Sequence, residues 1–214
     1  MPKILTPNDV LQFRQRLCDL ALKTFAEQGL EGMSLRGLAA AAGCSRTTPY
    51  RYFKNKADIL AAVRQAQFQR MAEENEAAAL KEDDPDRRLT ALARSYVSFA
   101  MANPDAYRVM FSVNQKDEQH YPELVKQIKR AQQPMKTVVD EALAKGSLHG
   151  DPGNIAHILW AGLHGIVSLH LSDKLHLGRG IDELAEVMIR SLGRAVAAKP
   201  SKQASTRRVQ EDSK

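Results

Sequence analysis

The chain has 214 residues, 43% of them hydrophobic, which is long enough for a small module beside a larger domain with its own core. Its net charge of +6 is uneven: residues 1–60 carry nine basic and five acidic side chains, residues 199–214 carry five and two, and residues 61–198 carry seventeen and eighteen. Two cysteines are too few for a disulfide or zinc scaffold. The N-terminus has no apolar core of the kind found in a signal peptide, and no apolar run is long enough to span a membrane. These features predict a cytoplasmic protein.

The first expected helix begins at Thr6, whose hydroxyl can cap a helix that starts with Pro7 and has Asp9 near its positive end. An apolar stripe at three- and four-residue steps continues this helix, and Gly29 ends it. The stripe consists of Phe13, Leu17, Leu20, Ala21 and Phe25.

Residues 34–56 are typical of two short helices joined by a tight turn. Ser34 is a suitable N-cap, and Leu38, Ala41 and Ala42 share one face, so the first helix can pack through small side chains. Gly43 follows where the chain must leave that helix with a positive φ. We expect Ser45 to cap the second helix, whose first two turns carry groups that bond DNA: Arg46, Thr47, Thr48, Tyr50 and Arg51.

In a helix-turn-helix, the N-terminal part of the second helix meets base edges in the major groove. The excess of basic residues in the same region suits attraction to phosphates. The sequence therefore predicts a DNA-binding module over residues 1–56.

Residues 42–60, Ala-Gly-Cys-Ser-Arg-Thr-Thr-Pro-Tyr-Arg-Tyr-Phe-Lys-Asn-Lys-Ala-Asp-Ile-Leu, resemble the DNA-binding signature of the TetR family of bacterial transcriptional regulators. Residues 25–30 also match the end of that family's first helix. Cys44 replaces the usual valine, which is a mild change at a small apolar position. Pro49 departs from the pattern and biases Thr48 away from helical angles, so we expect it to tighten or shift the start of the reading helix.

The resemblance implies a homodimer that reads a palindromic double-stranded DNA operator. Arg46, Thr47 and Thr48 offer donors and acceptors to bases, next to the capping Ser45. The remaining expected contacts are to the DNA backbone: Tyr50 and Tyr52 bond phosphates or pack on the sugars, Arg51 reads bases or phosphates, and Lys56 and Arg36 bind phosphates.

Helical periodicity continues through the rest of the chain, which predicts an all-α fold of about nine helices. Residues 57–198 should form a second domain, and the polar residues 199–214 a disordered basic tail. The expected helices are 57–79, one that residues 83–86 cap and that runs to Met101, 106–113, 122–145 with a possible kink at Pro134, 154–171 and 181–198.

The resemblance also implies that the second domain binds a small-molecule effector and dimerises through its last two helices. The apolar face of residues 181–198 suits a dimer and an intramolecular core equally well. Aromatic and methionine side chains suit a pocket for an irregular hydrophobic molecule, yet each of them would fit an ordinary core, which we favour for any single one. The candidate pocket residues are Phe99, Tyr107, Met110, Phe111, Met135, Trp160 and His164, with Tyr96 and Ala100 beside them.

Trp160-Ala-Gly-Leu-His164-Gly165 resembles the Trp-x-x-x-His-Gly element of one subgroup of TetR-type C-terminal domains. Trp160 and His164 are one helical step apart and share a face. We favour a structural interpretation, in which Trp160 fills the core, His164 bonds a backbone carbonyl and Gly165 permits a close helix contact. The alternative places the first two at the wall of a ligand pocket.

The sequence thus predicts a dimeric, ligand-responsive regulator, in this family most often a repressor, which a small hydrophobic molecule releases from its operator. Helix 57–79 would act as a lever between the two domains. A non-specific or architectural DNA binder is the alternative. The sequence contains no nucleophile–base pair, no phosphate-binding glycine loop and no metal-ligand spacing, so we expect no enzyme, no cofactor and no metal.

Overall fold

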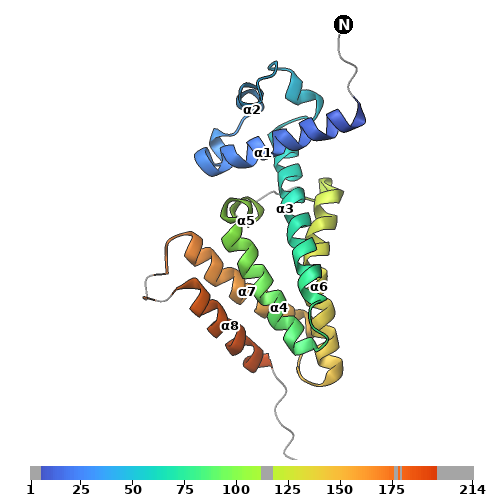
Figure 1. Ribbon diagram of the computed structural model, residues 1–214, viewed down its shortest axis with the longest axis vertical. Coiled ribbons are helices and arrows are strands. Elements are labelled where there is room, and N and C mark those ends of the chain that lie inside the picture. The colour runs from blue at the N-terminus through green and yellow to red at the C-terminus, as the bar shows by residue number, and fades with distance from the viewer. Residues whose placement is uncertain (1–5, 112–117, 176–177, 179, 197–214) are drawn as a thin grey trace, which may run out of the picture.

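The computed structural model describes residues 6–111, 118–175, 178 and 180–196. Within these ranges it has eight α-helices, two short 3-10 helices and no strand, which confirms the all-α prediction (Figure 1). The predicted tail lies outside the described residues. The elements are α1 (Pro7–Gly32), α2 (Leu35–Ala41), η1 (Thr48–Arg51), α3 (Lys56–Ala79), α4 (Pro85–Ala102), α5 (Pro104–Phe111), η2 (Glu118–His120), α6 (Pro122–Lys145), α7 (Pro152–Leu171) and α8 (Ile181–Val196).

Capping side chains fix where the long helices begin. Thr6 and Asp9 form the expected reciprocal cap of α1, with the Thr6 hydroxyl accepting from the Asp9 amide at 3.1 Å. Asn55, Asp84 and Asp151 cap α3, α4 and α7 in the same way, each accepting a backbone amide of the first turn. Because the first amides of a helix have no partner inside it, these caps determine the entry point of each helix.

The helix-turn-helix differs from its prediction in the second helix. Gly43 leaves α2 with a φ of 67°, as expected, but the reading segment is one 3-10 turn, Thr48–Arg51, and no two-turn helix begins at Ser45. The Ser45 hydroxyl bonds the hydroxyls of Thr47 and Thr48, at 3.1 and 2.7 Å, and caps no amide. Pro49 is buried and lacks an amide hydrogen, so an α-helical ladder cannot be continued through this point.

A smaller correction concerns α2. Its buried face is formed by Leu35, Leu38, Ala39 and Ala42, whereas Ala41 is exposed. Leu38 and Ala42 lie on the buried face as predicted, but Ala39 takes the place that was predicted for Ala41.

Two hydrophobic cores share the helix α3. Its first turns place Ile59, Leu60 and Val63 in the core of the DNA-binding module, together with residues of α1 and α2. Its middle places Phe68 and Met71 in the core of the larger domain. In Figure 1, α1 and α2 lie across one end of α3, while α4 and α6 run along the rest of it. The predicted boundary after residue 56 falls at the start of this shared helix.

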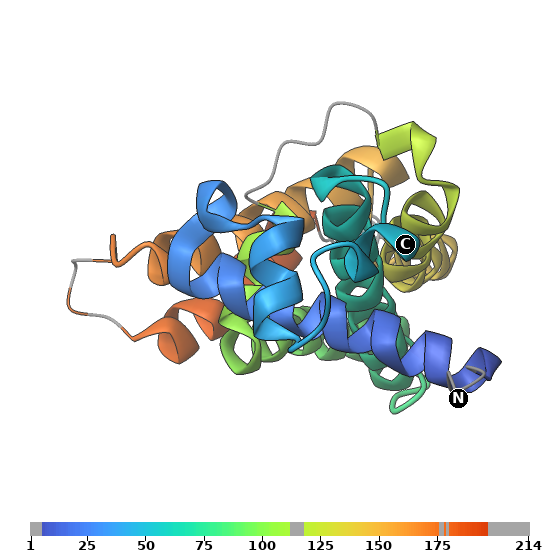
Figure 2. The ribbon, with the colours of Figure 1, turned by 90° about the horizontal axis from the view of Figure 1, so that it is seen from above.

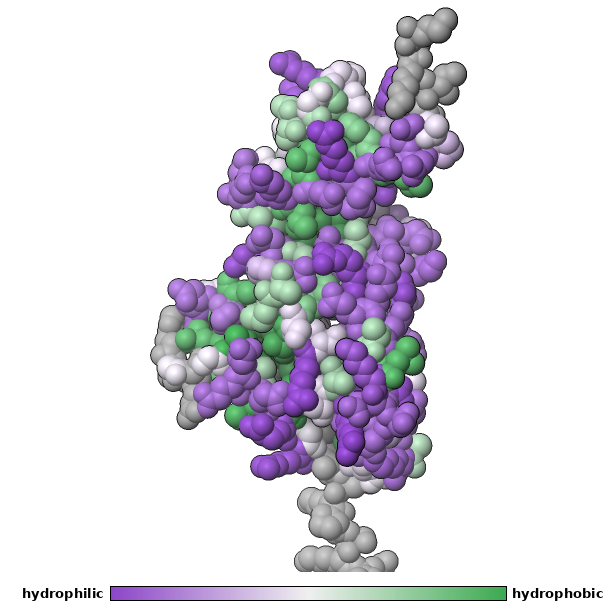
Figure 3. Space-filling view, viewed as in Figure 1, coloured by the Kyte–Doolittle hydropathy of each residue, from purple (hydrophilic) through white to green (hydrophobic). Residues whose placement is uncertain are grey.

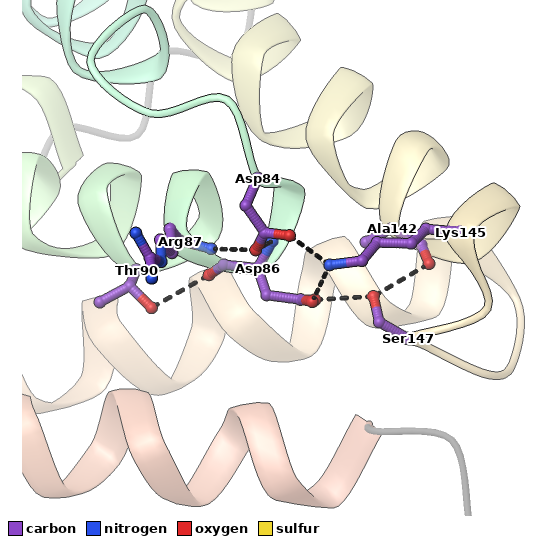
Figure 4. A network of polar contacts seen from close by, with 7 residues as sticks. All are labelled: Asp84, Asp86, Arg87, Thr90, Ala142, Lys145 and Ser147. Atoms are coloured by element: carbon purple, nitrogen blue, oxygen red, sulfur yellow. Dashed lines mark hydrogen bonds and ion pairs between the residues drawn. The ribbon is translucent and has the colours of Figure 1, made fainter.

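The far end of the larger domain is held by a polar network between the start of α4 and the end of α6 (Figure 4). The Lys145 ammonium donates to Asp84 and, at 2.8 Å, to Asp86. The Ser147 hydroxyl donates to the other oxygen of Asp86 at 2.7 Å. The hydrogen bond from Lys145 holds the pKa of Asp84 below its usual value. The network therefore fixes the turn between α3 and α4 against α6.

We expect Asp84→Ala to lower the melting temperature by about 2–4 °C at pH 7, because the α4 cap and an ion pair are lost together. A carboxyl group whose pKa is lowered by folding stabilises the protein above its unfolded pKa, and this contribution disappears as the pH falls through the lowered folded value. The difference between wild type and variant should therefore begin to shrink at about pH 4, the unfolded value, and disappear only at a lower pH, below the folded pKa. Thermal melts monitored by circular dichroism measure this. Asp83→Ala, which removes the exposed neighbouring carboxylate, should leave the melting temperature unchanged. An equal fall in the melting temperature of both variants would contradict the role of Asp84 as cap and ion-pair partner.

Candidate DNA-binding surface and ligand site

The residues predicted to contact DNA lie at the end of the molecule capped by α1 and α2, which Figure 2 shows from above. Most of their side chains are exposed, and Tyr50 has 51% of its surface accessible. Thr48, Tyr52 and Lys56 are half-buried. The exposed members are Arg36, Ser45, Arg46, Thr47, Tyr50 and Arg51.

Aromatic contacts and a cap position the segment that follows the reading turn. The Tyr52 ring packs on Phe13 of α1, with centroids 5.1 Å apart, so this tyrosine is anchored in the module. The Arg14 guanidinium lies 5.0 Å from the centre of the Phe53 ring. The Lys54 amide donates to Asp58 at 2.9 Å.

Sequence reasoning passed over Arg14 and Lys54 as candidates. Lys54 is exposed directly before the cap of α3, and Arg14 is half-buried on α1. Only the excess of basic residues in the first sixty pointed to them. The spacing of Asn55 and Asp58 was the signal for the cap that fixes Lys54 in place.

A hollow of about 250 Å³ opens between α5 and α7. It is lined by aromatic and polar side chains from both helices. Three of the seven predicted pocket residues line it: Tyr107, Phe111 and His164. Sequence reasoning missed the other lining residues, although Ser168 lies one helical step after His164, which was the available signal. These are Arg108, Ser168, Leu171 and Ser172.

The other predicted pocket residues lie outside the lining. Phe99 and Met110 are each 1% exposed and belong to the core of the larger domain. Met135 packs in separate clusters with Leu89. Trp160 borders the lining: its ring centre lies 5.4 Å from that of His164 and 6.4 Å from that of Phe111.

Buried hydroxyl groups and an imidazole form a chain behind the hollow. The Tyr107 hydroxyl lies 2.5 Å from Nδ1 of His164, and the Tyr96 hydroxyl lies 2.8 Å from that of Tyr107 and 3.1 Å from the same nitrogen. The Ser168 hydroxyl lies 3.3 Å from Nε2 of His164. Residues from α4, α5 and α7 thus meet at one ring.

Burial sets the protonation of this chain. It raises the pKa of Tyr107 to about 12 and that of Tyr96 further, and it lowers the pKa of His164. Both phenols therefore keep their protons at neutral pH, and the imidazole is uncharged. A neutral imidazole has one acceptor nitrogen, so only one of the two phenols can donate to Nδ1.

These positions correct the structural interpretation of the Trp-x-x-x-His-Gly element. His164 bonds side-chain hydroxyls and not a backbone carbonyl. Trp160 is 40% exposed, so it does not fill the core. A Cβ added to Gly165 would meet no atom of the described part of the chain within 4 Å, so no contact there requires a glycine.

A larger hollow of about 390 Å³ lies between α1 and α5. Its Lys23 and Glu27 side chains are 71% and 55% exposed, which makes it an open surface groove. It contains no buried polar group, so the smaller hollow has the better-defined chemistry. The lining of the larger hollow consists of Asp19, Leu22, Lys23, Ala26, Glu27 and Asp105.

The described residues contain no group of three or more His, Cys, Asp or Glu side chains that could hold a metal ion. Among the same residues, no helix is both long and apolar enough to cross a membrane.

Two family models match separate parts of the chain. Residues 17–63 match the bacterial regulatory proteins of the tetR family, and residues 89–192 match the tetracyclin repressor-like C-terminal domain. The second match does not establish the Trp-x-x-x-His-Gly subgroup, which stays a prediction.

The transcriptional regulator AcrR of Shigella flexneri is 36% identical over 58 residues, which are 27% of each chain, so the match spans about a quarter of that relative. A Rhodococcus protein of unknown function has a solved structure with 30% identity and a TM-score of 0.76, and the likeness covers 86% of this chain and 95% of that one. A regulator of the TetR/AcrR family from Thermobifida fusca is 25% identical with a TM-score of 0.65, covering 85% and 97%.

These matches decide between the two functions that the sequence left open. They support a regulator that recognises a DNA sequence and not an architectural DNA binder. The chain belongs to the TetR family and is a sequence-specific DNA-binding transcriptional regulator.

Proposed function

We propose that this regulator is a cytoplasmic, dimeric repressor that leaves a palindromic operator when a small molecule fills the hollow between α5 and α7. One observation carries the proposal. The helix that lines the hollow with Tyr107 and Phe111 also places Val109, which is 0% exposed, in the core of the DNA-binding module. A molecule bound in the hollow is therefore one short helix away from the DNA-binding surface.

The exposed groups around the reading turn supply the DNA contacts. Arg46 precedes the turn and can reach guanine edges, where arginine bonds two acceptors at once. Thr47 and Thr48 offer hydroxyls that Ser45 already orients. Tyr52 is held by Phe13, so its hydroxyl suits a fixed contact to the backbone. The expected backbone contacts are Arg36, Tyr50, Arg51, Tyr52 and Lys56.

The outer faces of α7 and α8 supply the dimer contact. Ile158, Leu169 and Val187 are 44–49% exposed there. In Figure 3, hydrophobic residues reach the surface on the side where α7 and α8 lie. The space above Gly165 is open, which allows the close approach of a second helix. A second copy covering this face would give the two-fold symmetry of a palindromic operator.

Coupling runs from α5 into α3. The Arg64 guanidinium of α3 donates to the Met110 carbonyl oxygen of α5 at 3.2 Å and contacts Glu118 at 2.5 Å. The first turn of α3 is held from α6 as well, since the hydroxyl of Tyr121, the N-cap of α6, donates to Asp58 at 3.1 Å. A shift of α5 would thus tilt the start of α3 and change the separation of the two reading turns. Release requires the ligand to prefer the wrongly spaced state, because equal affinity for both states shifts nothing.

For DNA recognition, we expect Arg46→Ala to cost about 1–3 kcal/mol of specific binding, because a base contact is lost. The measurement is a titration of DNA from upstream of this protein's own gene at two salt concentrations, with scrambled DNA as competitor. Arg87→Ala is the matched control, since it removes an exposed arginine of α4 far from the module. Equal losses in both variants would show that Arg46 contributes charge alone.

For the dimer, we expect Val187→Asp to raise the dimer dissociation constant by roughly 10–100-fold, because each interface would bury an unpaired carboxylate. Sedimentation equilibrium should show a monomer at concentrations where the wild type is dimeric. Leu80→Asp places the same charge on a side chain that is 86% exposed at the end of α3 and should leave the dimer intact. A dimeric Val187→Asp protein would rule out this face.

For the lever, spin labels on Lys54→Cys would measure the separation of the two DNA-binding modules. Burial raises the pKa of Cys18 to about 11, so it should not react with the label, and Cys44→Val removes the second thiol. We expect a separation that suits half-sites about 34–36 Å apart without ligand, and a different separation with a verified inducer. The same separation in both states would contradict the lever.

A further inference from the structure

The lining of the hollow between α5 and α7 is rich in hydrogen-bond donors. Arg108 is the charged lining residue, and among the described lining residues none carries a carboxylate. The Arg108 guanidinium donates to the Leu171 carbonyl oxygen at 2.9 Å and to the Asp105 carboxylate at 3.0 Å. That ion pair is almost half exposed, so another carboxylate can replace Asp105 at modest cost.

The hydrogen bonds of the buried hydroxyl chain can all run in one direction, from Tyr96 towards His164. Tyr96 can donate to Tyr107, and Tyr107 to Nδ1 of His164, which is the shortest contact of the group at 2.5 Å. The remaining imidazole proton is then on Nε2 and faces the Ser168 hydroxyl oxygen at 3.3 Å. The Ser168 hydroxyl also lies beside that of Tyr107, and because it lines the hollow it can turn its hydrogen towards a ligand acceptor there. Ser168 and Arg108 thus favour an acceptor or an anion.

Size and walls restrict the rest of the ligand. A cavity of about 150 Å³ accommodates benzene, whereas drug-sized ligands need roughly 300–1,000 Å³. A hollow of about 250 Å³ therefore suits one ring with a short substituent. The Phe111 ring centre lies 4.7 Å from that of Tyr107 and 4.9 Å from that of His164, so aromatic edges and faces border the space.

We propose that this hollow binds a single-ring aromatic carboxylate, with its ring beside Phe111 and His164 and its carboxylate on Arg108 and Ser168. The proposal rests on the ligand response assigned above to the same hollow, and it adds the chemical class of the ligand. It replaces the simple hydrophobic molecule expected from the sequence, because a purely apolar molecule would gain no hydrogen bond from Arg108 or Ser168.

Three probes of similar size separate the alternatives: benzoate, neutral benzyl alcohol and the cation benzyltrimethylammonium. Trp160 is the single tryptophan of the chain and borders the hollow, so its fluorescence reports occupancy alongside calorimetry. We expect benzoate to bind at least about tenfold more tightly than benzyl alcohol, since a charge-assisted hydrogen bond from Arg108 is added, and the cation to bind most weakly.

Arg108→Gln should reduce benzoate binding to the level of benzyl alcohol and leave benzyl alcohol unchanged, which also shows that the hollow is intact. Arg130→Gln is the matched control, because Arg130 pairs with Glu76 away from the hollow and should retain the preference for benzoate. Failure of all three probes to bind, a cation or alcohol that binds as well as benzoate, or an Arg108→Gln protein with wild-type benzoate affinity would each overturn the proposal.

Operator release measured on the same samples separates this inference from the proposed function. Benzoate that binds with the expected preference but leaves the operator complex intact would support the ligand class and contradict the ligand response. Release by a molecule that is not a carboxylate, combined with no binding of benzoate, would support the response and overturn the ligand class.

Discussion

The structure depends on the way α5 contributes to two hydrophobic cores at once. Val109 is fully buried among residues of α1, α2 and α3, while Tyr107 and Met110, two residues before it and one after it, are buried in the larger domain. An eight-residue helix cannot move one of these side chains without moving the others, because close-packed interiors transmit displacement and do not absorb it. The two halves of the chain are therefore mechanically joined at α5 as well as along α3.

Regular secondary structure was largely predictable because its causes are local. Thr6 and Asp9 define the start of α1, and the helical geometry breaks at Gly29 as expected. The reading turn was mispredicted because Pro49 and three neighbouring hydroxyls compete with an α-helical ladder.

Tertiary contacts were less accessible to sequence reasoning. The tyrosine partners of His164 come from α4 and α5, 68 and 57 residues away, and no local pattern identifies them. Trp160 was assigned to the core because a large aromatic residue on an apolar helix is usually covered. Periodicity identifies the apolar side of a helix, but it does not say whether this chain or another molecule covers it.

Helix α7 connects the hollow to the face proposed for the dimer. His164 and Ser168 line the hollow, while Ile158 and Leu169 of the same helix are exposed on the face proposed for the dimer. A ligand that moves α7 would change both the contact between protomers and, through α5, the angle of each module. The effects of two ligands on each other's binding free energy are reciprocal. Operator binding must therefore lower the affinity for the ligand by the same factor by which the ligand lowers the affinity for the operator. The ligand affinity of the free protein therefore exceeds that of the operator complex whenever the hollow controls release, and a ligand with equal affinity for both cannot be the inducer.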